Sequence, residues 1–225
     1  MRLFELTMKL HQFCQWPAMT RKEKKAMEKI LCFWSRSEPL EIFEYGSGYS
    51  TVYWARFLQR QGFIFHLHSI DNHAVWHKLV VRMIKQKGLQ EKVTLYLSEF
   101  KPFWEKAGWD WSRDPACGEF APASEAETDY IQKPLSLKRS FDLVIVDARF
   151  RRRCLEVARQ CLKSKGIVFL HDAQKSKYLE PTKLFKYSRF FDSGHYFPLE
   201  RTRYQFWVGS EDNAWVTSLS VKARY

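Results

Sequence analysis

One short stretch, residues 40–51, constrains the fold of this chain more than any other. An apolar run is followed there by Gly46 and Gly48, and then by hydroxyl side chains at the start of a helical pattern. Glycine permits positive φ and lets a ligand approach the backbone closely, and Ser50 or Thr51 can cap the helix. Because the free N–H groups of that helix point back at the turn, we predict a strand, a tight turn and a helix that hold a nucleotide-like ligand.

Apolar runs and amphipathic helical patterns alternate after this turn, which is typical of a parallel sheet with helices on both faces. The runs that we predict as further strands are residues 63–71, 93–97, 141–147 and 166–172. The helical patterns are residues 52–61, 73–87, 154–162 and 176–187. Two final strand-like stretches, residues 189–197 and 203–209, suit an antiparallel pair that closes the sheet. The expected fold class is therefore α/β, with a mostly parallel seven-stranded sheet.

The chain has 225 residues, of which 45% are hydrophobic, so we expect a single domain over residues 1–225. Residues 1–36 read as two amphipathic helices that cover the sheet, and Thr20 with Glu23 has the spacing of a capping box for the second helix. Residues 99–140 interrupt the alternation with tryptophans, prolines and acidic residues. We interpret this stretch as an insertion that serves as a substrate lid or binding loop, or as an excursion that only packs onto the domain.

The formal net charge is +12, so the surface field should attract anions. Phosphates, acidic glycans, nucleic acid and anionic membranes all fit that field, and so does a solvated basic face without a dedicated ligand. The cysteines are widely spaced, without a C-x-x-C pair, and we interpret them as free thiols: Cys14, Cys32, Cys117, Cys154 and Cys161. We find no signal-peptide core and no apolar run of membrane-spanning length, so we expect no transmembrane segment and a cytoplasmic location.

Ionisable side chains stand where four of the predicted parallel strands end. These residues are Glu44 before the glycine turn, Asp71, Asp147, and His171 with Asp172. Ligands bind at this edge of open parallel sheets. A carboxylate at the end of the second strand can accept hydrogen bonds from both hydroxyl groups of a ribose. Two ligands fit this arrangement, NAD and S-adenosylmethionine (SAM).

The acidic-x-Gly-x-Gly pattern at Glu44, Gly46 and Gly48 resembles the signature of class I SAM-dependent methyltransferases. A dinucleotide fingerprint would instead require a third glycine near Thr51. The resemblance extends over residues 38–210. It implies a Rossmann-like, doubly wound sheet with an antiparallel C-terminal hairpin, and it implies SAM as the cofactor.

Further motifs are similar to the O-methyltransferase branches of that family. These motifs are Tyr49-Ser50-Thr51, Ser69-Ile70-Asp71-Asn72 with Trp76, Val146-Asp147-Ala148-Arg149-Phe150-Arg151 and Leu170-His171-Asp172. The last two resemble a bacterial subgroup, part of which is linked to methylation of sugars or surface polysaccharides. That subgroup usually has glycine where this chain has Ala148, so we expect the turn after that strand to be wider or shifted.

The resemblance also implies which residues bind the cofactor. Glu44, Gly46 and Gly48 would hold the methionine end of SAM, and Asp71 would hold its ribose. Asn72, with Ser98 or Glu99, would lie near the adenine. The full predicted set is Glu44, Gly46, Ser47, Gly48, Ser50, Thr51, Asp71, Asn72, Ser98 and Glu99.

Methyl transfer to a hydroxyl group requires alignment of donor and acceptor and removal of the acceptor's proton. In one interpretation His171 is the general base, held in its tautomer by Asp172 or Asp147. In another, Asp147, His171 and Asp172 bind a divalent ion, magnesium or manganese, that lowers the pKa of the acceptor hydroxyl. A third leaves His171 and Asp172 as caps of the next helix. Arg149 and Arg151 would bind a phosphate or carboxylate of the substrate, unless they form a solvated helix face.

We therefore expect a SAM-dependent O-methyltransferase that acts on a small molecule or carbohydrate, including anionic acceptors. One alternative is a nucleic-acid methyltransferase, which the charge favours, but residues 147–150 lack the Asn/Asp-Pro-Pro-aromatic motif of base N-methyltransferases. Another is a non-catalytic basic module, or a basic adaptor at a membrane surface, that keeps the cofactor fold. The sequence does not determine the oligomeric state.

Overall fold

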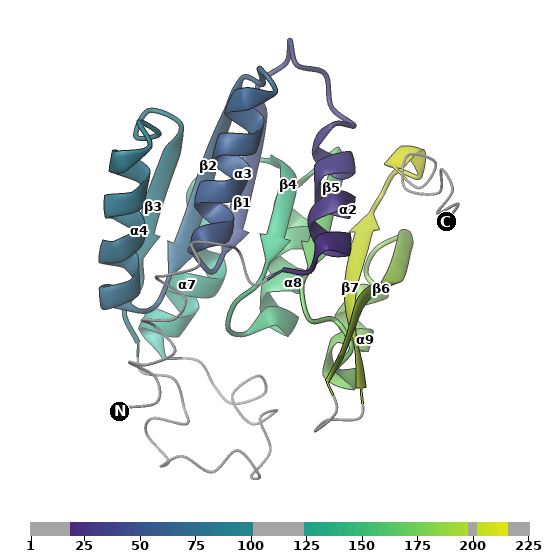
Figure 1. Ribbon diagram of the computed structural model, residues 1–225. Helices are drawn as coiled ribbons and strands as arrows, with labels where there is room; N and C mark the ends of the chain where they lie inside the picture. The colour runs from purple at the N-terminus through teal and green to yellow at the C-terminus, as the bar shows by residue number, and fades with distance from the viewer. Residues whose placement is uncertain (1–18, 101–123, 198–201, 216–225) are drawn as a thin grey trace.

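A seven-stranded sheet forms the centre of the computed structural model, which describes residues 19–100, 124–197 and 202–215 (Figure 1). The strand order is β3-β2-β1-β4-β5-β7-β6. The strands are β1 (Leu40–Tyr45), β2 (Phe65–Asp71), β3 (Val93–Leu97), β4 (Phe141–Val146), β5 (Leu162–Leu170), β6 (Tyr187–Phe197) and β7 (Thr202–Ser210). β1 to β5 pair in parallel, whereas β7 runs antiparallel to both β5 and β6. The predicted fold class, with its antiparallel C-terminal hairpin, is confirmed.

Helices cover both faces of this sheet. They are α2 (Arg21–Leu31), α3 (Tyr49–Arg60), α4 (Ala74–Gln86), α7 (Glu125–Ser136), α8 (Arg151–Cys161) and α9 (Leu179–Thr182), with a short 3-10 turn, η1, at Ser176–Tyr178. Figure 1 shows α2, α3 and α4 on the near face and α7 and α8 on the far face. Because successive strand residues point to opposite faces, the fully buried Ile42 and Leu67 pack with the first group, and Phe43 and Val144 pack with the second.

The capping box that the sequence predicts for the second helix is present at α2. The Thr20 hydroxyl oxygen accepts from the backbone N–H of Glu23 at 3.2 Å, and Glu23 Oε2 accepts from the backbone N–H of Thr20 at 2.7 Å. Met27, Ile30 and Leu31 are fully buried in the near core. α2 therefore covers the sheet as expected, and the first predicted helix lies outside the described residues.

Residues 125–136 form a regular helix, α7, inside the stretch that was interpreted as an insertion. Ser124 and Glu127 make a second capping box at its start, and its inner face is buried in the far core. α7 is the crossover helix between β3 and β4, so strand and helix continue to alternate. The interpretation of residues 99–140 as one insertion is therefore wrong for its second half. Residues 101–123 lie outside the described part of the chain, and a substrate lid there stays a prediction.

The helix predicted over residues 176–187 is confined to η1 and the single turn of α9. β6 begins at Tyr187, which pairs with Ser210 of β7. The chain therefore enters the antiparallel strand pairing at Tyr187, which prevents a longer helix, and the predicted helix was too long. β6 and β7 themselves lie where two strands were predicted.

The cysteines in the described ranges, Cys32, Cys154 and Cys161, are free thiols, as predicted. Cys154 and Cys161 are buried on α8 in the far core, and burial raises the pKa of the Cys161 thiol to about 12. These two side chains therefore act as small apolar packing residues. No helix in the described part of the chain is long and apolar enough to cross a membrane.

Replacing Tyr45 with phenylalanine tests the docking of α7. The buried Tyr45 hydroxyl donates to the backbone carbonyl of Ile131 in α7 at 2.7 Å. Loss of this hydrogen bond should lower the free energy of unfolding by about 1 kcal/mol, as measured by urea denaturation. The control is Tyr53→Phe, which removes a half-buried hydroxyl that bonds to Glu28 on the near face and should have a smaller effect. Equal stability of Tyr45→Phe and the wild type would contradict this docking.

Candidate functional site

The turn between β1 and α3 depends on glycine at position 46. Gly46 has a φ of +95°, which side chains rarely adopt, and an added Cβ would collide with the backbone carbonyl oxygen of Asp147. Its backbone N–H donates to the carbonyl of Ile70 at 2.8 Å. Gly48 differs, because its φ is −175° and an added Cβ would make ordinary contacts, the nearest with Trp76 at 3.6 Å. The surrounding packing therefore requires glycine at position 46 but would tolerate a side chain at position 48. Close approach of a ligand to the backbone would explain why position 48 is also glycine.

The buried carboxylate of Glu44 stabilises this turn through hydrogen bonds. Its carboxylate is fully buried and accepts from the hydroxyls of Ser50 at 2.7 Å, Thr51 at 2.5 Å and Ser69 at 2.8 Å. Burial raises the pKa of the Glu44 carboxyl group to about 7, although the three hydroxyl donors oppose the rise. The Thr51 hydroxyl in turn accepts from the backbone N–H of Gly48 at 2.8 Å. Glu44 thus orients the first turn of α3, and its predicted contact with the methionine end of SAM stays a prediction.

Asp71 places a carboxylate at the end of β2, beside this turn. Its Oδ1 accepts from the backbone N–H of His73 at 2.8 Å, and the residue is 8% exposed. Burial raises the pKa of the Asp71 carboxyl group to about 6, against the opposing effect of the bond from His73. A carboxylate at this position can accept hydrogen bonds from a sugar diol, so the residue fits the predicted contact with a ribose.

Trp76 closes one side of the turn. Its indole N–H donates to the backbone carbonyl of Ser47 at 2.5 Å, and its ring meets Tyr49 edge to face at 5.6 Å. The Ser47 hydroxyl lies 2.9 Å from the Ser69 hydroxyl. Ser47 is therefore fixed on both its backbone and its side chain, and the turn is rigid before any ligand binds.

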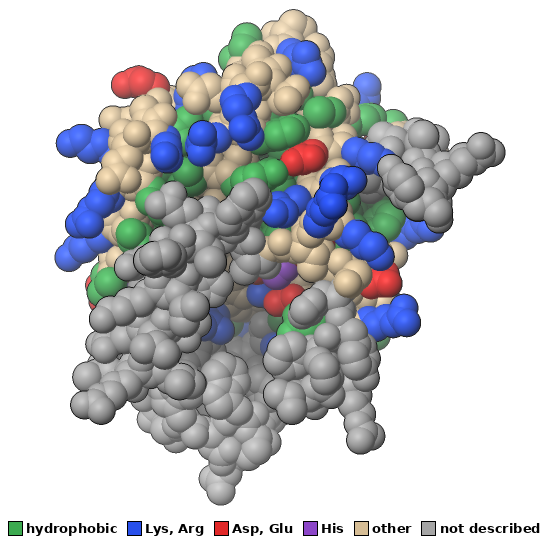
Figure 2. All heavy atoms as spheres, in the orientation of Figure 1, with side chains coloured by type: hydrophobic (Ala, Val, Ile, Leu, Met, Phe, Trp, Pro, Cys, Tyr) green, Lys and Arg blue, Asp and Glu red, His purple; other side chains and the backbone are tan. Residues whose placement is uncertain are grey.

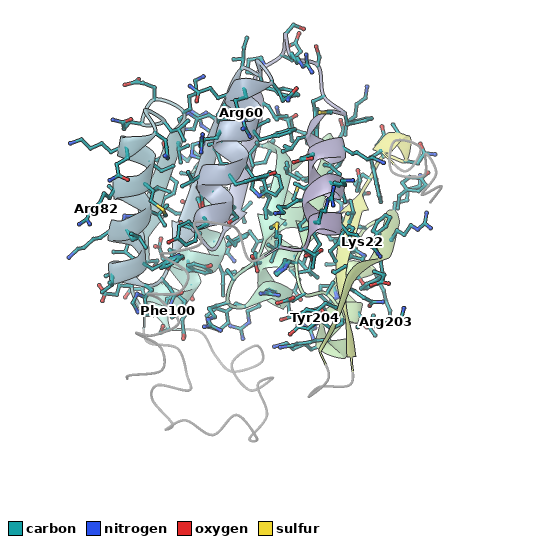
Figure 3. The ribbon with its side chains drawn as sticks, viewed as in Figure 1. Lys22, Arg60, Arg82, Phe100, Arg203 and Tyr204 are labelled. Atoms are coloured by element: carbon teal, nitrogen blue, oxygen red, sulfur yellow. The ribbon has the colours of Figure 1, made fainter. Side chains whose placement is uncertain are left out.

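The residues predicted near the adenine mainly bond within the protein. The Asn72 side chain donates to the carbonyl of Phe100 at 3.2 Å, and the Ser98 hydroxyl donates to the carbonyl of Ala126 in α7 at 2.8 Å. Glu99 is exposed. Figure 3 shows Phe100 beyond the end of β3, at the carboxyl edge of the sheet. Asn72 and Ser98 thus fix this corner of the edge, and their contacts with a cofactor stay predictions.

Asp147, His171 and Asp172 come together at the ends of β4 and β5, which we call the β4–β5 edge. His171 Nδ1 lies 2.9 Å from Asp147 Oδ1 and 3.7 Å from Asp172 Oδ2. Asp172 has a φ of 52°, and Phe150, after the end of β4, has a φ of 53°. Such left-handed backbone conformations are costly for residues with a side chain and gather at functional sites. Figure 2 shows basic, acidic and histidine side chains close together at this edge of the molecule.

Arg151 fills the space between the two aspartates. Its Nη2 lies 3.0 Å from Asp147 Oδ1 and its Nη1 lies 3.6 Å from Asp172 Oδ2. The same side chain donates to the backbone carbonyls of Ala148 at 3.0 Å and His171 at 2.6 Å. Arg151 therefore clamps the ends of β4 and β5 together, and the substrate contact predicted for it stays a prediction.

The predicted magnesium or manganese site does not fit this donor set. Asp147 and Asp172 both face the guanidinium of Arg151, and the Nδ1 atom of His171 bonds to Asp147. A divalent ion would require these oxygens and the ring nitrogen to turn toward a common centre. Among the described residues, no group of three or more histidine, cysteine or acidic side chains could hold a metal ion. The predicted metal ion is therefore not supported by the residues of this edge.

Glu23, which the sequence indicated only as a helix cap, also reaches the β4–β5 edge. Its Oε1 lies 3.5 Å from Nε2 of His171, so a carboxylate faces each ring nitrogen. Burial disfavours the charged ring, but Asp147, Glu23 and Asp172 outweigh that effect and raise the pKa of His171 to about 10. His171 is therefore an imidazolium at neutral pH, which does not fit the prediction that it is the general base.

The same pairing of opposite charges determines the pKa of the Asp147 carboxyl group at this edge. Burial alone would raise the pKa of the Asp147 carboxyl group, but His171, Arg151 and Arg149 hold it below its usual value. Arg149 is exposed and lies near enough to Asp71 for the two charges to interact. The β4–β5 edge therefore carries ionised groups of both signs next to the glycine turn.

The raised pKa of His171 predicts how stability depends on pH. A group with a raised pKa in the folded state stabilises fully below its unfolded pKa, and this stabilisation disappears as the pH rises through the folded pKa. The free energy of unfolding should therefore fall between about pH 7 and about pH 10, as measured by urea denaturation. In His171→Gln this part of the pH dependence should be absent. The same slope in both proteins would contradict the pairing.

A family model described as a methyltransferase domain matches residues 43–173, more than half of the chain. No curated protein sequence matches this chain. The matched segment contains the glycine turn, Asp71 and the β4–β5 edge, but not Glu23.

Solved structures share the fold at low sequence identity. An O-methyltransferase from Bacillus cereus in complex with S-adenosylhomocysteine (SAH) has a TM-score of 0.58 and 13% identity, and the match covers 91% of this chain and 88% of that one. The O-methyltransferase TomG from Streptomyces achromogenes, involved in tomaymycin synthesis and solved with SAM, has a TM-score of 0.50 and 13% identity, over 88% and 84%. The METTL16 methyltransferase domain has a TM-score of 0.51 and 10% identity, over 85% and 82%.

Proposed function

The chain belongs to the methyltransferase domain family as a class I SAM-dependent enzyme, and we propose that it methylates a hydroxyl group of a small molecule. One observation supports this most directly: the glycine turn and the β4–β5 edge are in contact. Gly46 packs against the backbone carbonyl of Asp147, whose N–H donates to the carbonyl of Tyr45 at 3.1 Å. A donor held at the turn and an acceptor held at the edge would therefore lie side by side.

The residues of the turn suit SAM, which supplies a methyl group that its positively charged sulfur already activates. The Asp71 carboxylate would hold the ribose, and the backbone N–H groups at the start of α3 would hold the methionine carboxylate. Glu44, Ser50 and Thr51 fix that helix start from behind. The SAM and SAH complexes of two structural neighbours support this choice of cofactor.

Asp172 is the group that we assign to accept the proton of the acceptor hydroxyl. His171 is charged, and the pKa of Asp147 is held low by its cationic neighbours, so neither is a good base. The Asp172 side chain is 26% exposed, more than any other carboxylate of the β4–β5 edge. The left-handed backbone of Asp172 fixes the direction of this carboxylate, which makes it a positioned acceptor of a proton.

The acceptor class that we propose is a small molecule or carbohydrate that carries an anionic group. Arg149 is exposed beside the end of β4, close enough to interact with the charge of Asp71. A guanidinium at that point can bind a carboxylate or phosphate of an acceptor. The net charge of +12 would also draw anionic acceptors to the surface.

Calorimetric titration with SAH tests the cofactor site. The wild type should bind, and Asp71→Asn should weaken binding by roughly tenfold to a hundredfold, since hydrogen bonds to a charged group are lost. Gly48→Ala should also weaken binding while leaving thermal stability nearly unchanged, because its Cβ would meet only ordinary contacts. Gly46→Ala should instead destabilise the fold. Absence of SAH binding by the folded wild type would refute the proposed cofactor.

Formation of SAH from SAM in the presence of test acceptors measures the transfer itself. The panel would contain catechols, uronic acids and sugar phosphates, with RNA as the arm for the nucleic-acid alternative. Asp172→Asn should lower kcat by about a hundredfold or more with an acceptor that reacts, because the proton acceptor is lost. Asp192→Asn on β6, where the carboxylate pairs with Arg203, is the control and should retain activity. Transfer to RNA alone would overturn the small-molecule assignment.

A further inference from the structure

Glu23 is a buried acid that does more than a helix cap requires. It is 1% exposed, and its Oε2 completes the capping box with the backbone N–H of Thr20. Its second oxygen, Oε1, accepts from the hydroxyl of Ser193 on β6 at 2.8 Å and faces Nε2 of His171 at 3.5 Å. A capping box uses only the first of these contacts. The second oxygen therefore links α2 to β6 and to the end of β5.

The His171 ring lies between carboxylates from two separate elements. Glu23 of α2 faces Nε2, and Asp147 at the end of β4 bonds to Nδ1 at 2.9 Å. Asp172 lies 3.7 Å from Nδ1, and Arg151 of α8 donates to the backbone carbonyl of His171. A neutral imidazole has one N–H and could donate to only one of the two flanking carboxylates, whereas an imidazolium donates to both. The geometry therefore suits a protonated ring.

We propose that Glu23 is a positioning residue of the β4–β5 edge: together with Asp147 it holds His171 as an imidazolium, which couples the docking of α2 to the arrangement of Asp147 and Asp172. The consequence of this role for catalysis rests on the proposed function, whereas the protonation state of the His171 ring does not depend on it. Loss of the Glu23 charge would leave Asp147 as the main partner of the ring. His171 would then release its proton at lower pH, and the hold on Asp147 would weaken.

The position of α2 supports this coupling. Lys22, the residue before Glu23, packs close to Gly194 of β6, where an added Cβ would lie 2.8 Å from the Lys22 side chain. Figure 3 shows Lys22 on α2 beside the β6–β7 hairpin, with Arg203 and Tyr204 further along the same hairpin. The start of α2 therefore docks onto the hairpin at the level of the β4–β5 edge. This contact places the Glu23 side chain next to His171.

The chain offers a variant that separates the two roles of Glu23. Glu23→Gln keeps an oxygen for the backbone N–H of Thr20, because glutamine also completes a capping box, but removes the charge that faces His171. Thr20→Ala does the reverse, since it removes the hydroxyl of the box and leaves the Glu23 charge in place. Glu28→Gln changes another acid of α2, one that bonds to Tyr53 instead of His171, and is the control for charge on the helix.

NMR titration of the histidine rings in the full chain with bound SAH tests the proposal, with His171 assigned from His171→Gln. In the wild type the ring should stay protonated to at least about pH 8, and in Glu23→Gln its pKa should fall by roughly one unit or more. Thr20→Ala should lower the melting temperature yet leave the pKa of His171 unchanged, and Glu28→Gln should leave it unchanged too.

Two results would overturn the proposal: a wild-type His171 ring that titrates near its ordinary value, or an unchanged pKa in folded Glu23→Gln. If Glu23→Gln does not fold, the wild-type titration still decides whether the ring is held as an imidazolium, and Ser193→Ala provides the second variant. Ser193→Ala removes a hydrogen bond to Glu23 but keeps the charge, so the pKa of His171 should not fall. The proposed function fails separately, if the wild type does not bind SAH, because the titration can also be run without ligand.

Discussion

The burial of one carboxylate, Glu44, sets the geometry of the carboxyl edge of the sheet. A buried carboxylate requires strong hydrogen bonds, and here they come from two hydroxyls of α3 and from Ser69 of β2. Glu44 and Ser69 are also register partners in the β1–β2 ladder. Because Asp71 lies two residues beyond Ser69 on the same strand, one set of bonds fixes the helix start and the end of β2 relative to the turn. The rest of the site is built around this rigid corner.

The β4–β5 edge follows a different rule, in which charges of opposite sign alternate. Glu23, His171, Asp147, Arg151 and Asp172 form a series in which each carboxylate is next to a cation. A metal ion would neutralise the same carboxylates, but here the protein supplies the positive charge from His171 after β5 and from Arg151 of α8. Cationic neighbours keep Asp147 ionised, and they leave the more exposed Asp172 as the group with room to meet an acceptor. In the proposed reaction, the residues that organise the edge are thus separate from Asp172, the residue that we assign to react.

The sequence was sufficient for the parts of the site that depend on local order. Each strand that ends in an ionisable group could be predicted, because strand periodicity and the parallel topology together bring those ends to one edge. It was not sufficient for pairings between distant segments: nothing local shows that Arg151 turns between Asp147 and Asp172, or that Glu23 reaches His171. These pairings are the reason that we propose a charged His171 and that the predicted metal ion does not fit this donor set.

The error in the stretch before β4 has a local cause. Ser124 and Glu127 show the spacing of a capping box, which was a sufficient signal for the start of α7. The acidic residues of the first turn favour a helix start but were interpreted as an acidic patch, and Pro134 inside the helix is more typical of a loop, so the signal was missed. The contacts of α2 are the opposite case, because its cap was recognised and its second partner was not. That partner, His171, follows β5 and lies far from Glu23 in the sequence, so the pairing forms only when α2 docks beside the end of β5, where Glu23 also accepts from Ser193 of β6.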